Sequence, residues 1–139
     1  MYFTDTDLKK GIYPEVLAVL TRTDDNVNAA IVEAMEEVRS YLCARYNMDL
    51  EFSKSGDSRN IRVINLIREI AIYNCYKGSN PANMPEIRQT IYKDTISALV
   101  KLQGEKASIP GLIRLESTTG GGSNYIKSGG NPRRRNNWN

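Results

Sequence analysis

The chain has 139 residues, 40% of them apolar and 25% charged, with a formal net charge of +3. This composition is typical of a single globular domain. The sequence contains no apolar run long enough to span a membrane, and its first residues, MYFTDTDLKK, lack the pattern of a signal peptide. We therefore expect that the protein has no membrane partner and that it is synthesised in the cytoplasm.

The sequence contains no histidine, which removes the usual general base, the commonest zinc ligand and every Ser-His or Cys-His catalytic pair. The two cysteines, Cys43 and Cys75, lie in predicted helices. We expect both to be small buried hydrophobic residues, although a disulfide between them remains open. These observations predict a protein that is not an enzyme and has no metal site or cofactor.

The positive charge is unevenly distributed along the chain. From Thr118 to the C-terminus there are four basic residues and no acidic one, which leaves 15 basic and 16 acidic residues in the remainder. The body of the protein is thus close to neutral. A basic tail on a neutral body indicates an arm for interaction rather than a requirement of the fold.

Two short helices are predicted near the N-terminus. Thr4 has the position of an N-cap, and Asp7 follows three residues later, as in a capping box. Gly11 interrupts this helix, and Pro14 is in a favourable position to begin the second one.

A longer amphipathic helix is predicted over residues 27–46. Its apolar residues recur with helical spacing: Val27, Ile31, Ala34, Met35, Val38, Tyr41, Leu42 and Tyr46. Thr23, Asp24 and Asp25 precede it and can cap its first turn. This helix must pack against other helices.

Residues 47–60 carry Gly56, Asp57 and several serines, which predicts a loop, with a short extended piece over residues 50–52. The 61–77 segment is apolar on almost every side, as in a central helix. A third long helix is predicted over 86–103. Three long and two short helices give an all-α fold, a small helical bundle.

The alternation in Leu112–Glu116 predicts a lone extended strand. Such a strand must pair with the 50–52 region, pair with another subunit, or remain an extended arm. Residues 118–139 are of low complexity, and alone they should not form a packed structure. We therefore divide the chain into a helical domain, residues 1–111, and an extended Gly/Arg-rich arm, residues 112–139.

The arm carries the candidate site for binding a partner. Its residues are Tyr125, Lys127, Arg133, Arg134, Arg135 and Trp138. Guanidinium groups bind carboxylates or phosphates, and an indole can anchor in a pocket. Docking on an acidic groove of another protein is favoured over nucleic-acid binding and over a merely solubilising tail, because four cations would neutralise only a few phosphates.

Three other residue sets have simpler structural interpretations. Glu33, Glu36 and Glu37 fit a solvated helix face better than a metal or acid-base set. If copies of the chain formed a ring, these carboxylates would be able to line its lumen. The Gly-rich 120–123 segment lacks the context of a phosphate-binding loop, so a flexible linker is favoured. The helical tyrosines fit core or subunit-interface packing: Tyr41, Tyr46, Tyr73, Tyr76 and Tyr92.

A set of residues occurs along the chain in a fixed order: Tyr2, Thr4 and Asp7-Leu8, then Tyr41-Leu42 and Arg45-Tyr46, then Ile70-Ala71 and Tyr73, then Tyr92 and Ala98-Leu99 ahead of Gly104. This ordered set resembles the Mu-type phage head-to-tail connector family, long known as a phage domain of unknown function. The resemblance covers about residues 2–112.

The resemblance implies a structural virion protein at the head-tail junction of a phage. Such adaptors are all-α, form a twelve-fold ring on the portal protein, extend the DNA channel and dock neck or tail proteins. DNA would pass through the lumen without sequence-specific binding. The alternative, from another class, is a small nucleic-acid-binding accessory protein that uses the basic tail.

Overall fold

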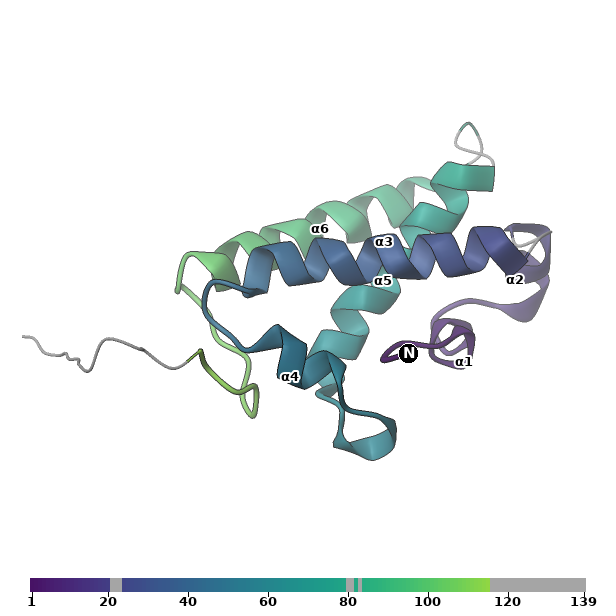
Figure 1. Ribbon diagram of the computed structural model, residues 1–139. Helices are drawn as coiled ribbons and strands as arrows, with labels where there is room; N and C mark the ends of the chain where they lie inside the picture. The colour runs from purple at the N-terminus through teal and green to yellow at the C-terminus, as the bar shows by residue number, and fades with distance from the viewer. Residues whose placement is uncertain (21–23, 80–81, 83, 116–139) are drawn as a thin grey trace, which may run out of the picture.

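The computed structural model describes residues 1–20, 24–79, 82 and 84–115. This part of the chain is all-α, as predicted (Figure 1). Its elements are α1 (Asp5–Lys9), α2 (Pro14–Leu20), α3 (Asp24–Leu42), α4 (Met48–Phe52), the 3-10 helix η1 (Gly56–Ser58), α5 (Ile61–Ser79) and α6 (Glu86–Gln103). None of these helices is long and apolar enough to cross a membrane.

The three long helices pack against one another, and α5 contacts both α3 and α6. In Figure 1, α3 and α6 run in about the same direction, and α5 crosses behind α3 in the reverse direction. Two hydrogen bonds fix this arrangement. The Asn74 side chain of α5 donates to the carbonyl of Ala30 near the start of α3, at 3.3 Å. Arg45, just after α3, donates to the carbonyl of Leu102 at the end of α6.

The core is apolar and is centred on α5, which confirms the prediction of a central helix. Nine residues of α5 are buried: Val63, Ile64, Leu66, Ile67, Ile70, Ala71, Ile72, Asn74 and Cys75. A helix that is apolar over most of its circumference can bury each side only if it has neighbours on several sides. Here α1, α2, α3 and α6 supply them. Ile61, at the first turn, is an exception and is 75% exposed.

The prediction of a loop with an extended piece over residues 47–60 was wrong in its details, because this segment contains α4 and η1. The Asn47 side chain accepts the backbone N–H of Leu50 at 3.1 Å and caps α4. Asp49 and Glu51 lie in its first turn, where carboxylates favour a helix. The helix has only five residues, too few for hydrophobic periodicity to be visible.

The strand predicted at 112–116 is reduced, within the described residues 112–115, to one antiparallel bridge. This bridge joins Arg114 to Tyr46. Asn47 N–H donates to the carbonyl of Ile113, and Leu115 N–H donates to the carbonyl of Arg45, each at 2.9 Å. The segment therefore pairs with residues 45–47 and not with 50–52. Glu116 lies outside the described residues.

Other boundaries also differ from the prediction. The helix predicted over 27–46 begins at Asp24 and ends at Leu42. Thr23, Asp24 and Asp25 were expected to cap this helix, but their side chains are not among those that the structure describes. Cys75 is buried as expected, but Cys43 is exposed, and both thiols are free. Cys43 directly follows the last residue of α3, Leu42.

Candidate functional site: the Tyr13 groove and the anchored C-terminal segment

The six predicted partner-binding residues lie in the part of the chain that the structure does not describe. They are Tyr125, Lys127, Arg133, Arg134, Arg135 and Trp138. The structure does describe the segment that leads into this arm, residues 104–115, and shows how it is attached to the body.

Arg45 and Tyr46 hold this C-terminal segment against the end of the helical bundle. The Arg45 guanidinium donates to the carbonyls of Leu102 and of Ala107, the latter at 2.9 Å. The buried Tyr46 hydroxyl accepts the backbone N–H of Ile109 at 3.2 Å. The guanidiniums of Arg45 and Arg114 lie 5.1 and 5.9 Å from the Tyr46 ring centroid, in cation–π range. The arm therefore starts from a fixed point on the body.

A polar cluster joins the N-terminus to the 47–60 segment, and we call it the polar layer: Tyr2, Asp7, Glu51, Arg59 and Asn60. Glu51 is 2% exposed and accepts the Tyr2 hydroxyl at 2.6 Å and the Asn60 N–H at 2.7 Å. Lys54 donates to its other oxygen at 3.0 Å. Burial alone would raise the Glu51 pKa, but these donors lower it overall. The buried carboxylate is thus ionised and fully partnered.

Asp7 is the second buried acid of the polar layer. Arg59 donates to it at 2.6 and 3.3 Å, and the backbone N–H of Thr4 donates at 3.0 Å, which confirms the predicted capping pair. Burial opposes ionisation, but these donors together bring the Asp7 pKa down to about 2. Arg59 also donates to the carbonyl of Tyr2 at 2.8 Å. The N-terminal residues are thereby fixed on the surface of the bundle.

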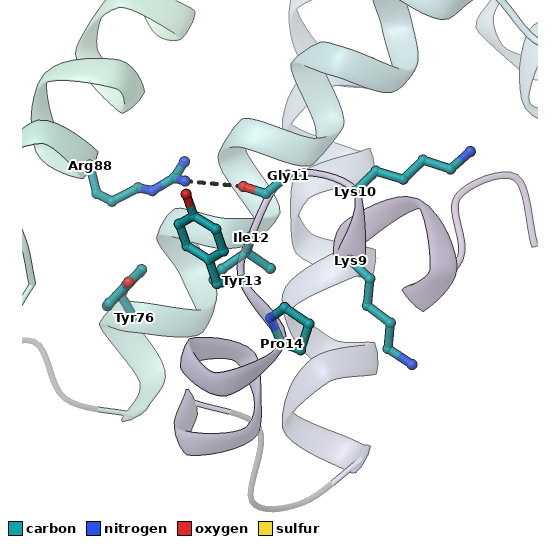
Figure 2. Close-up of a pocket in the computed structure, with 8 residues that line it drawn as sticks. All are labelled: Lys9, Lys10, Gly11, Ile12, Tyr13, Pro14, Tyr76 and Arg88. Atoms are coloured by element: carbon teal, nitrogen blue, oxygen red, sulfur yellow. Dashed lines mark hydrogen bonds between the residues drawn. The ribbon is translucent and has the colours of Figure 1, made fainter.

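An open groove lies between the α1–α2 connection and the bundle, and we call it the Tyr13 groove (Figure 2). It has a volume of about 530 Å³ and is lined by Lys9, Lys10, Gly11, Ile12, Tyr13, Pro14, Tyr76 and Arg88. Figure 2 shows Arg88 and Tyr76 reaching it from α6 and α5, while Lys9 and Lys10 extend outward from the opposite rim.

The position of Gly11 and Arg88 determines the shape of the groove. A Cβ at Gly11 would collide with Arg68 Cδ, so any larger residue would require the Arg68 side chain to move and glycine lets the chain pass close to α5. Arg88 donates to the Gly11 carbonyl and to Glu69 Oε2, each at 3.1 Å. The turn between the first two helices is therefore tied to both α5 and α6.

The charge of the groove is positive. Of the eight described residues that line it, three are cations and none is acidic. Arg88 is compensated by Glu69, and Lys9 pairs with Asp5 on the exposed surface of α1 at 3.2 Å. Tyr13 is 77% exposed and offers an aromatic surface between these charges. The sequence indicated Gly11 and Pro14 as helix boundaries and Tyr76 as a packing residue, but not that these residues meet Lys9, Lys10 and Tyr13 around one groove.

The acidic residues of α3 divide into two groups. Glu33 and Glu36 are exposed, as predicted for a solvated face. Glu37 instead accepts the Tyr92 hydroxyl at 3.1 Å, and burial together with this carboxylate raises the Tyr92 pKa to about 12. The Tyr92 ring stacks on Tyr73, with centroids 3.8 Å apart, which fits the predicted packing role. Within the described residues, no three acidic or cysteine side chains cluster as metal ligands.

The fold and these surfaces define a small all-α protein with an open cationic groove and an anchored C-terminal segment. The chain belongs to the Bacteriophage Mu, Gp36 family, whose family model matches residues 2–124. No curated protein and no solved structure matches it. The family membership confirms the phage class that the resemblance implied. The family description names a phage and no role in the particle, so the connector role remains a prediction.

Proposed function

We propose that this protein is a head-to-tail connector, a structural virion protein that forms a ring on the portal, extends the DNA channel and docks neck or tail proteins. Its work is assembly rather than catalysis. Twelve copies would match the portal, and closed symmetry converts many weak contacts into a stable assembly. Membership of the Bacteriophage Mu, Gp36 family supports the part of this proposal that makes the chain a phage protein.

The anchoring of the C-terminal segment is the structural observation that carries the proposal. Arg45 and Tyr46 fix residues 102–109 at one end of the bundle. An arm that leaves the body from a fixed point can be directed to one neighbour, and its glycines provide reach. Arg133, Arg134, Arg135 and Trp138 would then bind an acidic groove of the portal or of an adjacent subunit.

Before Thr118 the chain has 15 basic and 16 acidic residues, and this near-neutral body supports passage of DNA without specific binding. Most of its arginines are used in internal contacts: Arg39 with Asp49, Arg45 with two carbonyls, Arg59 with Asp7, Arg68 with the Asp7 carbonyl and Arg88 with Glu69. Affinity for DNA depends on the number of phosphates that cations neutralise. A nucleic-acid-binding role would therefore depend on the tail.

Deletion of residues 118–139 tests the proposal. The truncated protein should keep the helical circular dichroism of the full chain, because the core lies within residues 1–112. It should no longer co-sediment with portal particles. A matched variant, Arg133→Lys with Arg134→Lys and Arg135→Lys, keeps the charge and should retain part of the binding. Unchanged co-sedimentation of the truncated protein would rule out the arm as the portal-binding element.

A salt titration of DNA binding separates the connector from the nucleic-acid-binding alternative. A connector should show no useful DNA affinity at physiological salt. High affinity with a steep salt dependence that disappears on deletion of the tail would favour the alternative.

A further inference from the structure

The outer surface of α3 is acidic and partly apolar. Glu33 and Glu36 lie one turn apart and are exposed, and Val32 beside them is 50% exposed. Glu36 has only a long 3.8 Å contact with Arg39, and Glu33 makes no ion pair with any described residue. We call these three residues the α3 acidic strip. Glu33 and Glu36 are three residues apart, and Val32 and Glu36 are four apart, so each pair shares one side of the helix.

The Tyr13 groove has the complementary properties. Its rim carries Lys9 and Lys10, and among the described residues Lys10 has no ion-pair partner. Its wall carries the exposed aromatic ring of Tyr13. A helix surface with an exposed apolar side chain beside two carboxylates would place the apolar group on the ring and the carboxylates beside the lysines.

We propose that the Tyr13 groove binds the α3 acidic strip of a second copy of this chain. This inference rests on the proposed function, in which copies assemble side by side, and it names the two surfaces that meet. The α3 acidic strip cannot bind the Tyr13 groove of the same chain, because the strip lies on the middle of a rigid helix whose buried side is packed on α5. Because the two surfaces differ, each copy can bind one neighbour through its groove and another through its strip, and repeating this contact generates a ring or an open chain of copies.

The charges of the groove favour this occupant over two others. The arm of the chain itself carries four cations and no acid between Thr118 and Asn139, so the lysines would repel it. A nucleic acid would meet only three cations, of which Arg88 is already paired with Glu69 and Lys9 with Asp5. So few available charges would hold a phosphate backbone only weakly.

Charge reversal of the two surfaces tests the proposal. The groove variant carries Lys9→Glu and Lys10→Glu, and the strip variant carries Glu33→Lys and Glu36→Lys. The full-length wild type should self-associate in sedimentation velocity. Each variant alone should associate roughly a hundredfold more weakly, because like charges would face each other. An equimolar mixture should associate again, since the reversed groove of one variant fits the reversed strip of the other.

The matched control reverses two exposed lysines of α6, with Lys93→Glu and Lys101→Glu, and changes the net charge by the same amount as the groove variant. It should associate like the wild type, and all variants should show unchanged circular dichroism. The proposal is overturned by a monomeric wild type, by equal loss in the control, or by a mixture that stays dissociated. Binding of portal particles, measured separately, reports on the proposed function: a wild type that binds portal particles but does not self-associate would overturn this interface and leave the proposed function standing.

Discussion

The three long helices and the polar layer are stabilised in different ways. The helices bury apolar side chains against α5, whereas the polar layer is held by hydrogen bonds and ion pairs around Glu51 and Asp7. Apolar burial does not depend on pH, but a buried carboxylate stabilises the fold only while it is ionised. The body therefore has a pH-independent core and a pH-dependent layer that holds the N-terminus and the 47–60 segment in place.

The largest expected effect is in the core. Ile67 is fully buried, and Ile67→Ala should lower the free energy of unfolding by about 3 kcal/mol, through lost burial and the cavity left behind. Ile61→Ala in the same helix is the matched control, and because Ile61 is 75% exposed it should cost little. Urea denaturation at neutral and mildly acidic pH should give the same difference between the two variants.

The polar layer should respond to the loss of one charge. Glu51→Gln keeps the shape of the side chain but removes the anion that accepts from Tyr2, Asn60 and Lys54, and should cost about 2 kcal/mol in the same assay. Asp57→Asn, at an exposed position of the same segment, should be nearly neutral. Equal stability of the two variants would mean that Glu51 does not hold this layer.

Acid should weaken the polar layer through Asp7. Its pKa falls from 3.8 to about 2 on folding, so its contribution, roughly 2 kcal/mol, is present above pH 4 and is lost as the pH falls toward 2. Asp7→Asn should be less stable than the wild type at neutral pH. Its free energy of unfolding should also decrease less than that of the wild type between pH 4 and pH 2. Asp5→Asn, on the exposed side of α1, should leave the pH profile unchanged.

The smallest expected effect concerns the anchor of the arm. Tyr46→Phe leaves the Ile109 N–H without its acceptor and should cost about 1 kcal/mol. Hydrogen exchange should quicken at the amide of Ile109 more than in the middle of α5. Uniform acceleration throughout the chain would instead indicate that the C-terminal segment has no separate anchor.

The sequence predicted the apolar part of the molecule well, because helical periodicity is a local signal. The central position of α5 and the Thr4–Asp7 cap follow from residues within a few positions of each other. The polar layer was missed because Tyr2 and Glu51 are 49 residues apart, and nothing in either short segment indicates that the other is its partner.

The Tyr13 groove was missed for the same reason. Arg88 meets the Gly11 carbonyl only once α6 has packed on the bundle. The α4 helix was interpreted as part of a loop because Gly56, Asp57 and the serines of the 47–60 segment are typical of turns. The pairing of residues 113–115 with 45–47 depends on where α3 ends, which periodicity places only approximately.

Electron microscopy of the purified full-length protein mixed with portal particles tests the connector role most directly. The account predicts a ring of added density, coaxial with the portal and lengthening its channel, at the end where the tail attaches. Portal particles that look the same with and without the protein, at concentrations where it is folded, would contradict it.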